Sequence, residues 1–138
     1  MSEQNNFVQV TPFLVVPDVE AAIAFFRDVL GFEVWRMPGA TYAYVHRETV
    51  GFRLLQAGPG NEFVPGNRRF AHYIDVKDVD ALYAELKPKL DLLPPGDVHG
   101  SADKSYGQRE LLVLAPDGNL IAFGHAIFNK MVKEVPKT

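Results

Sequence analysis

The sequence predicts an α+β fold made of two tandem βαβββ modules, because one pattern occurs in it twice. The strand-like residues 13–16 are followed by Asp18, and the strand-like residues 73–76 are followed by Asp78. Each Asp precedes a helical pattern. The two strand-like segments begin 60 residues apart (13 and 73), and the two Asp residues are also 60 residues apart (18 and 78). The shared offset indicates an internal repeat within a single domain, residues 1–138.

The two predicted helices cover residues 19–30 and 79–88. Apolar residues recur in both at i, i+3, i+4, i+7 and i+11, the spacing of a buried stripe. They are Val19, Ala22, Ile23, Phe26 and Leu30 in the first copy and Val79, Leu82, Tyr83, Leu86 and Leu90 in the second. A short carboxylate before each helix suits an N-cap. Gly31 is expected to end the first helix, and Pro88 to end or loosen the second.

Strand-like segments separated by turn residues follow each helix. They are Glu33–Met37, Thr41–His46 and Gly51–Gln56 in the first half, and Glu110–Leu114 and Asn119–His125 in the second, with one short strand expected within Asp91–Ser105. Gly58–Asn67 has the composition of a linker. The modules are therefore expected at about residues 6–57 and 69–126, followed by a tail that packs as a short helix or stays loose.

Composition excludes several classes of protein. The 138 residues are 47% hydrophobic, which supports a real core, and contain no cysteine, which excludes disulfides and a thiol nucleophile. The net charge is −3 with scattered Lys and Arg, so nucleic acid is not an expected partner. No apolar run approaches the roughly 18 residues of a membrane helix, and the N-terminus lacks signal-peptide features. We expect a soluble cytoplasmic protein with no membrane partner.

General catalytic motifs are missing from the sequence. The serines do not occupy a nucleophile elbow, and no glycine-rich phosphate loop follows a strand. The four histidines form no His-x-x-x-His pair, and a lone histidine is more typical of a surface or an edge strand than of a metal site. These patterns by themselves predict no enzyme.

Several motifs nevertheless occur in an order typical of one superfamily. They are the helix openings Asp18–Ala21 and Asp78–Ala81, the segment Phe25–Phe32 and the late turn Pro116–Leu120. Together with the repeat, over roughly residues 8–126, they resemble the vicinal oxygen chelate superfamily of glyoxalases, extradiol dioxygenases, fosfomycin-modifying enzymes and bleomycin-resistance proteins. The resemblance implies curved half-barrel sheets around a cavity, usually in a dimer.

Enzymes of this superfamily hold a metal ion on cavity-facing strand positions. The matching positions here are Thr11, Arg53, Ala71 and Ala122. Such side chains do not bind a divalent cation, and an Arg repels one. His72 and His125 lie an odd number of residues from these positions, so strand alternation is expected to point them to the opposite face. The resemblance therefore implies no metal and no cofactor.

Without metal ligands, the nearest branch is the bleomycin-resistance type, whose members sequester a large planar, cationic drug between subunits without catalysis. The segments Ser105–Glu110 and Phe70–Leu86 look like that branch. Two departures concern the ligand. The aromatic residue is Tyr106 where the bleomycin binder has Trp, and drug-binding members are more acidic than a net charge of −3. The resemblance implies a ligand of this kind, and the two departures weaken the case for bleomycin itself.

Aromatic residues are the first candidate ligand contacts, because a cavity lined by rings suits flat apolar molecules. Tyr106, in a loop before a strand, and Tyr42, beside a Pro-Gly turn, are expected to line the cleft. Trp35 and Tyr44 fit a packed core or a dimer interface as well as they fit a pocket.

Two charged residues complete the candidate ligand-binding set. Arg53 is suited to a ligand anion or to an ion pair with an acidic neighbour such as Glu110, and the ion pair is the safer interpretation. Phe63, in the linker, is a candidate anchor on a partner subunit.

Three functions remain open on the sequence alone. The leading hypothesis is a metal-free, homodimeric binding protein that sequesters a planar aromatic ligand, an antibiotic among the candidates, in a cleft at the dimer interface. The second is a glyoxalase- or dioxygenase-like enzyme, with unusual metal ligands or as a metal-independent isomerase with Glu110 or His72 as base. The third is a structural or regulatory dimer with a collapsed cavity.

Overall fold

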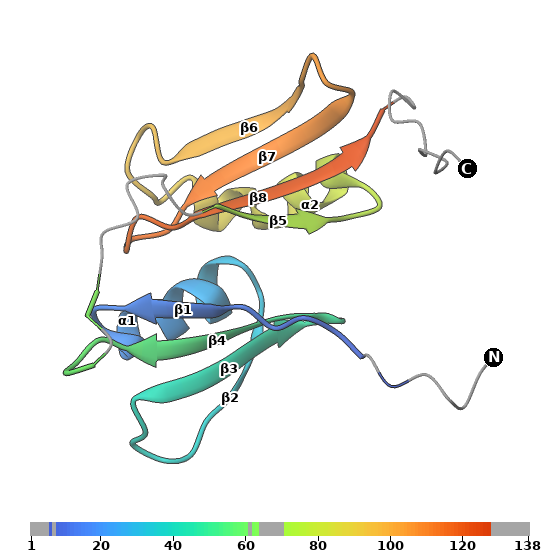
Figure 1. Cartoon of the computed structure of the whole chain (residues 1–138). Coiled ribbons are helices and arrows are strands. Elements are labelled where there is room, and N and C mark those ends of the chain that lie inside the picture. The colour runs from blue at the N-terminus through green and yellow to red at the C-terminus, as the bar shows by residue number, and fades with distance from the viewer. Residues whose placement is uncertain (1–5, 7, 61, 64–70, 128–138) are drawn as a thin grey trace. The chain divides into compact units, whose positions relative to one another are not determined.

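The computed structural model describes residue 6 and residues 8–60, 62–63 and 71–127. The chain divides into two compact units, Met1–Val64 and Pro65–Thr138. Figure 1 shows that each unit has its own sheet and its own helix. Within the described residues, no helix is long and apolar enough to cross a membrane.

The first unit contains a four-stranded sheet, sheet 1. Its elements are β1 (Phe13–Val16), α1 (Val19–Ala24), the π-helix η1 (Phe25–Val29), β2 (Glu33–Trp35), β3 (Tyr42–Arg47) and β4 (Val50–Gln56). The strand order is β1-β4-β3-β2, with β1 parallel to β4 and the other pairs antiparallel. The first strand of the unit therefore pairs with its last strand.

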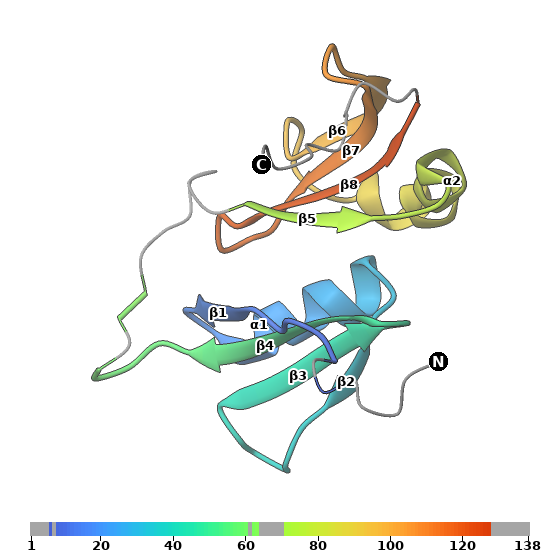
Figure 2. The same ribbon diagram turned by 45° about the vertical axis from the view of Figure 1, so that its right-hand side comes forward.

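The second unit repeats this plan in sheet 2. Its elements are β5 (Ala71–Asp75), α2 (Val79–Leu90), β6 (Val98–Asp103), β7 (Gln108–Leu114) and β8 (Leu120–Ala126). The order is β5-β8-β7-β6, again with the first and last strands parallel (Figure 2). The predicted α+β fold of two βαβββ modules is confirmed.

Both helices begin at the predicted Asp caps. The carboxylate of Asp18 accepts from the backbone N–H of Glu20 at 2.9 Å, and that of Asp78 accepts from the backbone N–H of Ala81 at 3.0 Å. These bonds satisfy N–H groups that have no partner within the helix.

A side chain from the last strand of each unit provides a second contact to the helix start. The backbone N–H of Val19 donates to Oε1 of Gln56 at 3.0 Å, and that of Val79 donates to Nδ1 of His125 at 2.9 Å. In both units, a side chain of the last strand therefore bonds the first residue of the helix at an equivalent position, but the residue type differs.

One face of each sheet packs against the helix of the same unit, and it carries the core. Buried apolar residues at alternate strand positions form this core: Leu14, Val16, Ala43, Val45, Phe52 and Leu54 in sheet 1, and Ile74, Leu111, Val113, Ile121 and Phe123 in sheet 2. Glu110 and Ala122 are also buried, on the other face of sheet 2. Because successive strand residues point to opposite sides, the residues between them form a helix-free face on each sheet.

The second half of the first helix differs from the prediction. The α-helix ends at Ala24, and residues 25–29 form a π-helix in which the N–H of Leu30 donates to the carbonyl of Phe25 at 3.2 Å. The wider turn brings both Phe25 and Phe26 into buried positions, with their rings edge to face at 5.6 Å. Gly31 then ends the helix as predicted, with φ of 78°.

Of the two effects expected of Pro88, ending the second helix does not occur, since α2 continues to Leu90. A proline in the last turn removes only one backbone hydrogen bond. Leu86 and Leu90 are both buried, and this packing stabilises the turn around the proline.

Strand boundaries differ from the predictions by a few residues. β2 ends at Trp35 rather than Met37, β7 begins at Gln108 rather than Glu110, and the short strand expected within Asp91–Ser105 is β6. The predicted start of the second module at residues 69–70, linker residues 64–67 and the tail after residue 127 lie outside the described residues.

Candidate functional site

A row of four side chains crosses the helix-free face of sheet 1. The strand register places Trp35 opposite Tyr44, Tyr44 opposite Arg53, and Arg53 opposite Phe13. Phe13, Tyr44 and Arg53 alternate with buried core residues, and Trp35 lies opposite Tyr44, so all four share the face that the helix does not cover. Phe13 and Trp35 are 59% and 66% exposed.

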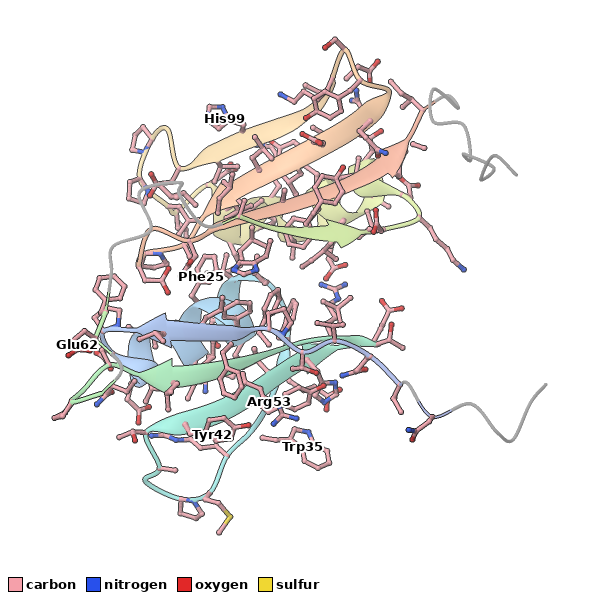
Figure 3. All side chains as sticks on the ribbon, in the orientation of Figure 1. Phe25, Trp35, Tyr42, Arg53, Glu62 and His99 are labelled. Atoms are coloured by element: carbon pink, nitrogen blue, oxygen red, sulfur yellow. The ribbon has the colours of Figure 1, made fainter. Side chains whose placement is uncertain are left out.

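Two further rings extend this row into a continuous surface. The ring of Tyr42 lies 6.4 Å from that of Phe13, and the ring of His46 stacks on Tyr44 at 5.5 Å and meets Trp35 at 6.0 Å. Figure 3 shows Trp35, Tyr42 and Arg53 on the strands of this sheet. We call the set Phe13, Trp35, Tyr42, Tyr44, His46 and Arg53 the aromatic face.

Arg53 is held in the middle of the aromatic face by two tyrosines. Its Nη1 donates to the hydroxyl of Tyr42, and its guanidinium carbon lies 5.3 Å from the centre of the Tyr44 ring. The second contact has cation–π geometry. No carboxylate pairs with Arg53 among the residues that the structure describes.

A glycine makes room for the ring of Tyr44. A β-carbon added at Gly51 would lie 2.5 Å from the Tyr44 hydroxyl oxygen and 2.7 Å from a ring carbon. The ring therefore lies over the bare backbone of β4, which fixes its place beside Arg53. The side chain of Gln9 also donates to the Tyr44 hydroxyl, at 3.3 Å.

The helix-free face of sheet 2 contains a buried carboxylate. Glu110 in β7 is 5% exposed, although the residues on either side of it point toward α2. Its Oε1 accepts a hydrogen bond of 2.7 Å from the hydroxyl of Tyr106, which lies in the turn between β6 and β7. Tyr106 as a whole is 57% exposed, so the residue is bonded at its hydroxyl and otherwise largely open to solvent.

Tyr73 is the second phenol near Glu110. Its hydroxyl lies over Gly124, where an added β-carbon would come within 2.7 Å of the ring, and it donates to Gln108 at 3.4 Å. Burial of the hydroxyl and the nearby carboxylate of Glu110 raise the pKa of Tyr73. The hydrogen bond to Glu110 also raises the pKa of Tyr106. Both phenols therefore stay protonated as donors at neutral pH, and we call Tyr73, Tyr106 and Glu110 the phenol cluster.

The positions that correspond to metal ligands carry the predicted side chains on the predicted faces. Arg53 is on the helix-free face of sheet 1, and Ala122 lies opposite Tyr73 on that of sheet 2. Ala71 lies on the same side of β5 as Tyr73, two residues away, and Thr11 lies just before β1. Within the described residues, no three His, Cys, Asp or Glu side chains group together.

The two nearby histidines face the helix side, as alternation predicts. His125 accepts from the first N–H of α2, so its ring has a structural role. His72 shares its side of β5 with the buried Ile74, and burial lowers the pKa of its imidazole.

The structure thus gathers four of the six candidate ligand contacts on sheet 1: Trp35, Tyr42, Tyr44 and Arg53. The other two, Tyr106 and Glu110, contact each other on sheet 2. Sequence reasoning missed Phe13, His46 and Tyr73. The signal was present, because Phe13 and Tyr73 occupy the same place in the repeat and alternate with core residues.

Comparisons with known proteins agree with this architecture. A bleomycin resistance protein of Geobacillus stearothermophilus is 28% identical over 131 residues, which cover 84% of this chain and 95% of that protein. A bleomycin-binding protein of Streptomyces verticillus, solved with copper(II)-bleomycin, is 26% identical with a TM-score of 0.68, covering 87% of this chain and 97% of that one.

A third similarity concerns the fold alone. A glyoxalase/bleomycin resistance protein/dioxygenase from Nocardioides superposes with a TM-score of 0.71 at 18% identity, over 97% of this chain and 93% of that one. Residues 6–123 match the family profile itself. The chain belongs to the Glyoxalase/Bleomycin resistance protein/Dioxygenase superfamily.

Proposed function

We propose that this chain is a small-molecule binding protein of the bleomycin-resistance type, which holds a planar aromatic ligand. The observation that carries the proposal is the aromatic face. The ring of Phe13 contacts that of Tyr42, the ring of His46 contacts those of Trp35 and Tyr44, and Arg53 joins the two groups. Phe13 and Trp35 nevertheless remain mostly exposed. Exposed clusters of large apolar side chains mark binding surfaces, and rings stack on flat ligands.

The similar proteins support a binding role of this kind. The Streptomyces verticillus protein is described as bleomycin-binding, and the Geobacillus stearothermophilus protein as a bleomycin resistance protein. The match to each covers most of both chains, and the family profile matches residues 6–123, which include the strands that carry the aromatic face.

We further propose that the protein acts as a cytoplasmic homodimer with its ligand cleft at the subunit interface. Four large aromatic side chains on the helix-free faces are more than 40% exposed: Phe13, Trp35, Tyr73 and Tyr106. A second subunit would reduce this exposure, and twofold dimers are the commonest assembly among soluble homo-oligomers. Phe63 stays a candidate anchor for that contact.

Calorimetric titration combined with thermal unfolding tests the binding function. The panel contains bleomycin and several planar aromatic compounds, with cyclohexane analogues of matched charge as controls. A true ligand at about 100 times its Kd stabilises the folded protein by about 2.7 kcal/mol, which raises the melting temperature. Absence of heat and of any thermal shift across the aromatic panel would contradict the proposal.

A further inference from the structure

We infer that the aromatic face selects a planar ligand that carries a carboxylate, and that Arg53 receives this group. The inference deepens the proposed function and rests on it, because it assigns a charge to the ligand that the aromatic face would bind. The similar proteins do not carry the argument, which depends on the surroundings of Arg53 alone.

Arg53 has donor groups that the described residues leave unused. A guanidinium has five N–H donors, and in this structure only Nη1 donates, to the Tyr42 hydroxyl. The Tyr44 ring contacts the cation through its face and accepts no conventional hydrogen bond. Several N–H groups are therefore available to an oxygen acceptor.

The charge of Arg53 is also not compensated in the way that other arginines are. Arg27, Arg36 and Arg109 each form an ion pair with a carboxylate, at 2.9, 2.6 and 2.8 Å. Arg53 is half-buried among aromatic rings and forms no such pair within the described residues. A partly desolvated cation beside apolar rings favours an anion that arrives with the ligand.

One carboxylate shares the helix-free face of sheet 1. Glu33 lies opposite His46, in the row next to the one that contains Arg53, and it is exposed. No ion pair joins it to Arg53. The other strand residues on this face, apart from Arg53, include no Asp, Glu, Lys or Arg. Glu33 and Arg53 are therefore the charged strand residues on this face, and Arg53 is the one held between Tyr42 and Tyr44.

The two tyrosines hold the guanidinium ready for a carboxylate. Tyr42 and Tyr44 fix it from two directions, and Gly51 fixes Tyr44 in turn. A planar guanidinium matches the two oxygens of a carboxylate, and an already ordered donor loses little entropy on binding. Rings on both sides of Arg53 would stack on the flat part of the same molecule.

Three planar probes of nearly the same shape test the charge preference: 2-naphthoate, 2-naphthamide and 2-naphthamidine. They are anionic, neutral and cationic at pH 7. Calorimetry gives the affinities, and the indole N–H signal of Trp35 locates binding, because Trp35 is the only tryptophan and lies in the row of Arg53. We expect naphthoate to bind at least about 10-fold more tightly than naphthamide, and naphthamidine most weakly.

Two substitutions connect the preference to Arg53. Arg53→Gln should abolish the advantage of naphthoate over naphthamide and change naphthamide affinity by less than about threefold, because the rings remain. Arg53→Lys keeps the charge and should retain part of the advantage. Arg27→Gln is the matched control, since Arg27 lies in the π-helix and pairs with its neighbour Asp28, and it should leave the preference intact.

The possible results separate the charge preference from the binding function. If naphthamide or naphthamidine binds as tightly as naphthoate and shifts the Trp35 signal, the inference fails and the proposed function stands. An advantage of naphthoate that persists in Arg53→Gln also overturns it. If none of the three probes nor any compound of the wider aromatic panel binds, both the proposed function and the inference fail.

Discussion

Tyr106 illustrates how one side chain can be both fixed and available. Its hydroxyl is bonded to Glu110, a residue that is 5% exposed, while Tyr106 itself is 57% exposed. The turn that carries it ends at Gly107, whose φ of 93° favours glycine. The ring is therefore presented in a limited range of orientations, which suits stacking on a ligand.

Tyr106→Ala and Tyr106→Phe should separate the roles of ring and hydroxyl. Both leave buried Glu110 with one donor fewer, so both should lower the free energy of unfolding by about 1.5–3 kcal/mol. Only Tyr106→Ala removes the ring, and it should weaken binding of a planar aromatic ligand by roughly 1–3 kcal/mol, or about 5- to 150-fold. Urea unfolding and calorimetry measure the two quantities.

Tyr83→Ala is the control, because Tyr83 lies on α2 and its hydroxyl reaches over Gly100 of β6. It should leave affinity unchanged. Unchanged affinity in Tyr106→Ala together with a large loss of stability would make Tyr106 a purely structural residue.

Gly51→Ala should damage the site more than the fold. The added β-carbon would lie within 2.9 Å of three atoms at the far end of the Tyr44 side chain, so the ring must move away from Arg53. Displacing a side-chain end costs little stability, whereas the cation–π contact with Arg53 is lost. We expect a loss of affinity for planar ligands with less than about 1 kcal/mol of destabilisation.

Gly58→Ala is the matched control for that substitution, because nothing lies within 4 Å of the added carbon and its φ is ordinary. Its affinity for planar ligands, measured by calorimetry, and its free energy of unfolding, measured in urea, should equal those of the unsubstituted protein. Equal affinities for Gly51→Ala and the unsubstituted protein would show that the position of Tyr44 is irrelevant to binding.

At the scale of elements, the π-helix has a packing role. It positions Phe26, whose ring contacts those of Phe25, Phe32 and Phe52 at 5.6, 5.2 and 5.4 Å. Phe26 is fully buried, so this aromatic cluster joins the end of the helix to β4. The helix-facing side of sheet 1 is stabilised here, away from the aromatic face.

Phe26→Ala should therefore cost about 3–5 kcal/mol of unfolding free energy, because it removes a buried ring and leaves a cavity. Phe13→Ala is the comparison, since Phe13 is 59% exposed. It should cost much less stability and should lower the affinity for a planar ligand. Urea unfolding measures the loss of unfolding free energy in both variants. Equal losses would contradict the placement of Phe26 in the core and Phe13 on the exposed face.

The elements also show what the sequence could predict. The sequence repeat, the helix caps and the strand alternation were sufficient to predict both modules, because each of them is a local pattern. The π-helix was missed because the spacing from Phe26 to Leu30 also fits an α-helix. The helix continues past Pro88 because the burial of Leu90 outweighs one missing backbone hydrogen bond.

The candidate site was predicted in part for a similar reason. Trp35, Tyr42, Tyr44 and Arg53 were selected by residue type, but their common row depends on pairing between strands far apart in the chain. The bond from Tyr106 to Glu110 spans four residues across a turn, and such geometry cannot be read from periodicity.

At the scale of the whole molecule, the two units share one plan and differ in chemistry. Their helix-facing sides both carry aliphatic and Phe residues. Their helix-free faces differ: Arg53 corresponds in strand pairing to Ala122, and Tyr44 to Leu112. Sheet 1 therefore contributes rings with a cation, and sheet 2 contributes phenols with a carboxylate.

The exposed rings lead to a prediction about assembly. Light scattering at micromolar concentration should give a mass of twice 15.4 kDa, because pairing would cover apolar faces that one chain leaves exposed. The melting temperature should also rise with protein concentration. A single 15.4 kDa species under these conditions would rule out the dimer.

The parallel pairing of first and last strands has a consequence for the order of folding. Phe13 pairs with Arg53 across 40 residues (53 − 13), whereas Arg47 pairs with Val50 across a short turn. Closing the longer loop costs more chain entropy, so the β3–β4 hairpin should form first and β1 should join last.

Two adjacent amides of the first unit should report this sequence of events. The N–H of Gln56 donates to Thr41 just before β3, while the N–H of Ala57 donates to Val16 of β1. In pulsed hydrogen-exchange labelling during refolding, Gln56 should become protected before Ala57. Simultaneous protection would mean that β1 docks together with the hairpin.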